Sequence, residues 1–437
     1  MRALVLDVPN LINNGNNRAD RIDCLLPAAY IARHPHYIQL PAGGPPVANI
    51  AGKSYGMTAF TPMSPLKTWG LRAAFAAIHL GLFKTDQVKL RNLSFIHFAR
   101  WVIIGRRQFP RLARTQPQED LAYDYLLFES NFNGAWEQYI DAFSDVIPGG
   151  MDHIWMWSQK YPKSIPVNPF LDYIRANQIE TTYYYNAYED ASTNDIKMAL
   201  RFAREFQPIV AASARQTPND FQRAYNALMT TIQTPPSGLD ERTERPPSGL
   251  TILSPISPDD STKHKIGNHT KAIRRLLLDL PTGSASPLAR VDTTHLARWV
   301  VVDDVADEGY PAAEDHLKSA YLLFTSNFDG TLDAYLDAMV ERIPEVVDGL
   351  WKHCAGYPGL QNRGAFKKYM RRCQVKTTFF FPAYPQATLA EVRRALALQR
   401  GFVDLFIANQ GKPAAVQQQQ FTLFANARQP GRAAAVS

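Results

Sequence analysis

An internal repeat constrains the fold of this chain more than any other feature of its sequence. The string YLLFESNFNG (125–134) recurs as YLLFTSNFDG (321–330), an offset of 196 residues, and the match continues without a gap to 200 and 396. More than a third of the positions in this window are identical. A match of this length indicates a tandem duplication, in which two related units bury a shared core.

The match resumes upstream at slightly different offsets, as a loop insertion would produce. HFARWVII (97–104) recurs as HLARWVVV (295–302), and MTAFTPMSP (57–65) recurs as LTILSPISP (250–258). The repeats therefore predict five parts of the chain. These are an N-terminal extension (1–56), repeat 1 (57–206), a linker (207–249), repeat 2 (250–410) and a disordered tail (411–437).

Each repeat predicts the same order of elements, described here for repeat 1. Strands at 57–63, 97–104 and 125–132 are rich in β-branched and aromatic residues, and a helix is expected over 69–83. An amphipathic helix follows, with apolar residues at i, i+3, i+4, i+7 and i+11, until Pro148. A short helix (152–158) and an aromatic strand, TTYYYNAY, come next. A capping box then marks the start of the last helix, at Ser192/Asp195 here and at Thr388/Glu391 in repeat 2.

This order is β-α-β-β-α-β with a trailing helix, the ferredoxin-like arrangement, and it predicts an α+β fold. Such a unit leaves one apolar face of its sheet uncovered, so we expect the two sheets to pack together around a pocket. In the order of its elements and in its duplication, the chain resembles the dimeric α/β-barrel superfamily in its fused, pseudo-dimeric form. That superfamily includes dye-decolourising peroxidases, chlorite dismutases and cofactor-free monooxygenases.

The peroxidase resemblance points to particular residues. Those enzymes carry a Gly-x-x-Asp-Gly stretch, whose nearest match here is Ser326–Gly330, with serine in place of the first glycine. The resemblance implies Asp329 as an acid beside haem and His353 as the metal ligand, with His316 as a weaker candidate. The alternative is that Asp329 only caps the helix that follows it.

The repeated His-x-Ala-Arg-Trp motif supplies further candidates. Strand alternation predicts that His97 and Trp101 share one face and that Arg100 lies on the other. A histidine can act as a general base and an arginine can bind a carboxylate. The alternative is a structural role, with arginine paired to Asp152 or Asp348. Candidates for catalysis are His97, His295, Arg298 and Asp329, and candidates for substrate binding are Trp101, Trp299, Tyr188, Tyr384 and Arg100.

Composition narrows the classes of function. The net charge is +7, there are three cysteines, and no secretory signal or membrane span is evident, so we expect a cytoplasmic protein. RNA-recognition modules share the element order, but their third strand is basic and aromatic, unlike YLLF, so nucleic acid is not expected as a partner. We expect an oxidoreductase acting on a small apolar molecule between the repeats. A non-catalytic binding or scaffold protein is the alternative. Haem and self-association are left open.

Overall fold

The computed structural model describes residues 48–80, 82, 93–233, 247–258 and 267–428. Two antiparallel sheets lie at its centre. The first has the order β1-β2-β4-β3-β9 and the second the order β5-β7-β8-β6. The strands of the first sheet are β1 (Ile50–Ala51), β2 (Ser54–Met63), β4 (Asp124–Asn133), β3 (Ile96–Ile104) and β9 (Phe379–Pro382). Those of the second are β5 (Tyr183–Asn186), β7 (Thr294–Val302), β8 (Tyr321–Phe328) and β6 (Ser248–Pro255).

The last strand of each repeat lies in the sheet of the other repeat. β9 comes from repeat 2 and pairs with β3, whereas β5 comes from repeat 1 and pairs with β7. Shortly before each exchanged strand, the chain makes a bridge to its own sheet, from Gln178 to Ala59 and from Gln374 to Ile252. The exchange therefore joins the two sheets through the backbone.

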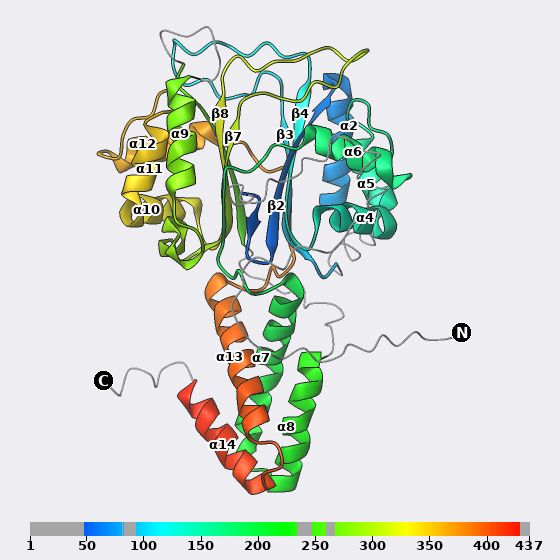
Figure 1. Ribbon diagram of the computed structural model, residues 1–437, viewed down its shortest axis with the longest axis vertical. Coiled ribbons are helices and arrows are strands. Elements are labelled where there is room, and N and C mark those ends of the chain that lie inside the picture. Colours follow the sequence, from blue (N-terminus) through cyan, green and yellow to red (C-terminus); the bar gives the residue numbers. More distant parts are fainter. Residues whose placement is uncertain (1–47, 81, 83–92, 234–246, 259–266, 429–437) are drawn as a thin grey trace, which may run out of the picture. The chain divides into compact units, whose positions relative to one another are not determined.

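The sheets pack face to face, and the helices cover their outer faces (Figure 1). One continuous apolar cluster fills part of the space between the sheets, with Phe60 and Leu127 from the first sheet and Leu253 and Leu323 from the second. The first outer face is covered by α2 (Pro65–His79), α4 (Trp136–Val146), α5 (Pro148–Trp155) and α6 (Val167–Asn177). The second is covered by α9 (Asn268–Asp279), α10 (Leu332–Arg342), α11 (Pro344–Trp351) and α12 (Arg363–Cys373).

Local sequence explains where several helices begin. Pro148 and Pro344 end the preceding helices, as predicted, and each is also the first residue of the next helix, where no backbone N–H is needed. Two short 3₁₀ helices, η1 (Gly283–Ala285) and η2 (Pro287–Arg290), precede β7. Both predicted capping boxes are present, at Ser192 and at Thr388.

Four further helices extend beyond one end of the sheets (Figure 1). They are α7 (Thr193–Ser213), α8 (Pro218–Gln233), α13 (Leu389–Ala408) and α14 (Ala414–Ala427), and they share an aromatic core. The prediction of a disordered tail is therefore wrong for α14, and the predicted linker contains the end of α7 and all of α8. The predicted N-terminal extension likewise ends too late, because β1 and the start of β2 precede residue 57. None of the described helices has the length and apolar character needed to cross a membrane.

Candidate functional site

Two fully buried arginines cross the space between the sheets. Arg298 leaves β7 and donates hydrogen bonds to the opposite sheet, to the carbonyl oxygens of Met57 (2.6 Å) and Ser130 (2.9 Å). It also donates to Thr58 Oγ1 (3.1 Å) and to the side-chain oxygen of Asn131. The two terminal nitrogens of the guanidinium therefore tie the two sheets together through four hydrogen bonds to oxygens of the opposite sheet.

Arg100 makes the reciprocal contacts from β3. It donates to the carbonyl oxygens of Leu250 and Ser326, the latter at 3.0 Å, and to the side-chain oxygen of Asn327. Its Nε lies 3.5 Å from Glu129, a carboxylate that is only 1% exposed. Burial lowers the pKa of Arg100 to about 10, and the charge of Glu129 acts in the opposite direction. Glu129 also accepts from Thr325, its counterpart in repeat 2, at 3.0 Å.

These contacts indicate that both arginines hold the sheets together rather than bind a substrate. The predicted partners are wrong: Asp152 accepts from Tyr161 (2.7 Å) and Asp348 accepts from Tyr357 (3.1 Å), both in the outer helical layer. The predicted shared face of the histidine and tryptophan is also not observed. A register shift between Ile96 and Phe98 places His97 at a bulge. Trp101 instead packs against Trp155, with ring centroids 6.5 Å apart.

The two motif histidines are joined by a buried chain of side chains. His97 Nδ1 is 3.0 Å from the hydroxyl of Tyr384, which bonds the hydroxyl of Tyr188, which is 3.3 Å from His295 Nδ1. The other nitrogen of His295 is 2.9 Å from Asp329. The structure thus brings together five of the predicted site residues, and the four rings among them are at most 4% exposed.

The two ends of this chain differ. Asp329 accepts from His295 and from the backbone N–H of Leu389 (2.7 Å), so it caps α13 rather than the helix that follows it. Its counterpart Asn133 caps α7 in the same way, accepting from the N–H of Thr193 at 2.8 Å. The Nε2 atom of His97 is buried without a hydrogen-bond partner among the described residues. Burial lowers the pKa of His97 to about 3, and the charges of Lys197 and His295 act in the same direction.

This lowered pKa predicts acid sensitivity. Between about pH 6.5 and pH 3, the unfolded His97 binds a proton that the folded state excludes, so stability falls as the pH falls. Between pH 7 and pH 5, we expect the free energy of unfolding of the His97→Gln variant to fall by about 2 kcal/mol less than that of the wild type. The reason is that a shift of one pKa unit corresponds to 1.36 kcal/mol. Urea unfolding at both pH values measures this. The exposed His316 has a pKa raised by Asp304 and Glu314, so His316→Gln should not reduce the loss. Equal losses in wild type and His97→Gln would contradict the prediction.

The residues proposed to flank a haem do not fit one. Asp329 directly follows β8, whereas His353 lies near the other end of that strand, where its carbonyl oxygen accepts from Ser257 N. Eight residues of β-strand span more than roughly 20 Å, so the two side chains cannot serve opposite sides of one iron. His353 Nδ1 is instead 3.0 Å from His269 Nδ1. In the described parts of the chain, no group of three His, Cys, Asp or Glu residues could hold a metal ion.

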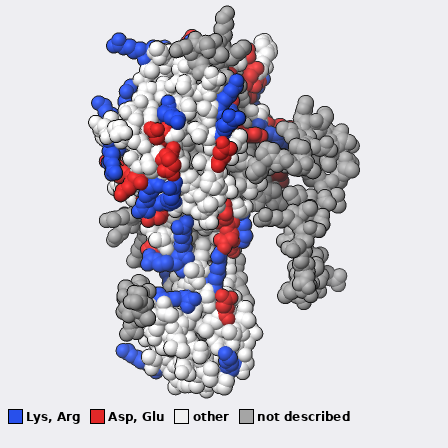
Figure 2. Space-filling view, turned by 60° about the vertical axis from the view of Figure 1, so that its left-hand side comes forward, with Lys and Arg blue, Asp and Glu red and all other residues white. Residues whose placement is uncertain are grey.

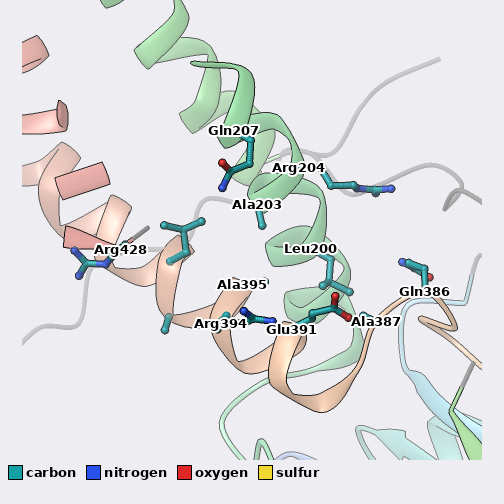
Figure 3. A pocket seen from close by; sticks show the side chains of 12 residues that line it. Leu200, Ala203, Arg204, Gln207, Gln386, Ala387, Glu391, Arg394, Ala395 and Arg428 are labelled. Atoms are coloured by element: carbon teal, nitrogen blue, oxygen red, sulfur yellow. The ribbon is translucent and has the colours of Figure 1, made fainter. Parts of the chain in front are cut away.

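A pocket of about 520 Å³ lies between α7 and α13, where the sequence indicated no site (Figure 3). Its floor is apolar and its rim is polar. The floor contains Leu200, Ala203, Ala387, Ala395 and Leu398, the exposed rim contains Arg204, Gln207, Glu391, Arg394 and Arg428, and Gln386 lines the pocket with its polar atoms buried. Basic side chains gather on these helices next to the sheets, while their far end carries few charges (Figure 2).

The charges of this rim are unbalanced. Glu391 accepts from the N–H and the hydroxyl of Thr388, at 2.8 and 2.9 Å, and so is held by the capping box. The ion pairs found among the described residues involve arginines other than Arg204, Arg394 and Arg428. The Arg428 guanidinium stacks on Phe424, 3.9 Å from the ring centroid.

No protein-family model matches this chain, and no curated protein matches it at a significant level.

Proposed function

We propose that this chain is a non-catalytic binding protein for a small molecule, which it holds in the pocket between α7 and α13. The observation that carries the proposal is the contrast between two places in the molecule. The predicted site residues between the sheets are buried and engaged with one another, whereas the pocket is open, has an apolar floor and falls within the usual range of ligand sites, about 300–1,000 Å³.

In this proposal the sheets form the scaffold as two tandem ferredoxin-like units in a pseudo-dimeric α/β barrel. The support is the repeated element order and the exchange of β5 and β9, which carries the chain from one sheet to the other on both sides. The buried arginines and the His–Tyr chain then stabilise the scaffold. Their occurrence in both repeats agrees with a role in the fold.

A peroxidase- or monooxygenase-like oxidoreductase is the competing proposal. It would require a substrate to reach the hydroxyls of Tyr188 and Tyr384 or the ring of His97, which is 0% exposed. An absorbance spectrum of the protein purified after expression with added haem distinguishes the two. We expect no Soret band, and a stoichiometric band that His295→Ala abolishes would favour the oxidoreductase.

Filling the pocket tests the binding proposal. The neutral fluorophore N-phenyl-1-naphthylamine should bind the wild type at about one equivalent, and Ala203→Trp should weaken it by about tenfold or more, a loss of at least 1.4 kcal/mol. The matched control is Gln399→Trp, which places the same side chain at the equivalent position of α13, outside the pocket. Circular dichroism verifies that both variants fold, with Ala203→Leu as the milder substitute. Equal binding by wild type and Ala203→Trp would contradict the proposal.

A further inference from the structure

The repeat relates the two sides of the α7–α13 pair to each other. Tyr188 and Tyr384, which precede these helices, are 196 residues apart, and the same offset relates the residues of α7 to those of α13. Arg204 therefore corresponds to Arg400. Gln386, which also lines the pocket, corresponds to Asp190. A comparison of the two sides shows how the charged side chains of the pocket differ from those at the equivalent positions.

On the other side, an arginine and a carboxylate satisfy each other. Arg400 lies 2.6 Å from Asp190. Its hydrogen bond lowers the pKa of Asp190, and the carboxylate raises the pKa of Arg400. The guanidinium and the carboxylate are thus paired within the protein.

On the pocket side, the same position lacks its anion. Gln386 is neutral, and both its side-chain nitrogen and its oxygen are buried without a hydrogen-bond partner among the described residues. Arg204 keeps the position of Arg400, and among the described residues it forms no ion pair; the charge of Arg204 helps to lower the pKa of Glu205, but that carboxylate pairs with Arg201. Figure 3 shows the two side chains at the same end of the pocket, each from a different helix or its leading segment. A buried amide without a partner costs free energy that a ligand can recover.

Other exchanges make the pocket more positive than its counterpart. Arg394 replaces Met198, and Arg428 replaces Ile232. Gly401 replaces Glu205, and a Cβ atom there would lie 2.7 Å from the guanidinium of Arg428, so the glycine leaves room for this arginine. The pocket lining has three arginines and one carboxylate, whereas the equivalent positions hold two arginines and two carboxylates.

We propose that the ligand is an amphipathic organic anion whose acidic headgroup lies between Arg204 and Gln386, in place of the carboxylate that Asp190 supplies on the other side. The guanidinium pairs with the anionic oxygens, and the Gln386 amide nitrogen donates to one of them. The apolar part of the ligand covers Leu200, Ala203 and Leu398. This inference rests on the proposed binding function and specifies its ligand class.

Displacement of bound N-phenyl-1-naphthylamine tests the headgroup. Decanoate should displace it from the wild type at a concentration at least tenfold lower than 1-decanol, which has the same chain without the charge. Gln386→Asp supplies the missing carboxylate internally, so it should weaken decanoate at least tenfold and leave 1-decanol unchanged. Arg204→Gln should have the same effect. Arg400→Gln removes the same charge from the other side. It should leave unchanged the concentrations of decanoate and of 1-decanol that displace the fluorophore.

The outcomes separate the two proposals. Equal displacement by decanoate and 1-decanol would overturn the anion site while leaving the binding function intact. Failure of the fluorophore to bind the wild type, together with no heat of binding for decanoate in calorimetry, would overturn both. Displacement of decanoate by inorganic phosphate at equal concentration would show a site for free small anions and would also overturn the amphipathic class. Equal weakening by Arg400→Gln would show a general effect of net charge, against the inference.

Discussion

Replacing Arg100 with methionine is expected to lower the free energy of unfolding by about 3–5 kcal/mol, the range found when one partner of a buried ion pair is removed. The substitution leaves the Glu129 carboxyl group, which is 1% exposed, between the sheets without its guanidinium partner. It also leaves the carbonyl oxygens of Leu250 and Ser326 without their guanidinium donors. Urea unfolding followed by circular dichroism measures the change.

Two further variants separate charge from packing. Glu129 corresponds to Thr325 in repeat 2, so Glu129→Thr places in repeat 1 the residue that the fold already accepts in repeat 2. In the double variant Arg100→Met/Glu129→Thr no unpaired carboxylate remains, and we expect it to regain about 1–2 kcal/mol relative to Arg100→Met. The control is Arg400→Met, which breaks a pair whose side chains are 55% and 66% exposed and should cost under about 1 kcal/mol. If Arg100→Met lowered the free energy of unfolding by as little as Arg400→Met does, the role of Arg100 between the sheets would be refuted.

The sequence predicted the elements of the fold better than their connections. Richness in β-branched and aromatic residues located β3 and β7, and i/i+3/i+4 spacing located α4 and α10, because composition and periodicity are local properties of each segment. Alternation of residues does not say which sheet a strand joins. The exchange of β5 and β9 therefore had no signal in either copy alone.

The same distinction applies to the site. The repeated motif identified His97 and Arg100 as unusual, and both are fully buried, but the bulge at Ile96/Phe98 broke the alternation on which the predicted face of His97 depended. The pocket was missed because its residues belong to two helices that are distant in the sequence. A signal was nevertheless present, since Gln386 and Asp190 differ at equivalent positions, and such a difference between copies is where a single specialised site should be sought.

The repeat also extends further along the chain than the predicted ends of repeat 1 and repeat 2. The offset of 196 residues continues from Pro218, where α8 begins, to Ala414, where α14 begins. Little identity remains there, but aromatic or apolar character persists, as in Tyr225 with Phe421 and Leu228 with Phe424. Glutamines 417–420 and the alanines around them suggested a disordered segment by composition, whereas the packing of four helices depends only on the few positions that face inward.

The last of these helices offers a direct test, because Phe421→Ala is expected to lower the free energy of unfolding by about 3–5 kcal/mol. Phe421 is 0% exposed, and its ring centroid lies 5.1 Å from that of Phe221 and 5.2 Å from that of Phe206. Truncation would leave a cavity among aromatic rings that the surrounding helices can only partly close. Leu423 is on the same helix and 57% exposed, so Leu423→Ala should change stability by no more than about 0.5 kcal/mol. Urea unfolding of both variants measures the difference. If the tail were disordered, as its composition suggested, the two substitutions would have the same negligible effect, and α14 would have no part in the core of the four helices.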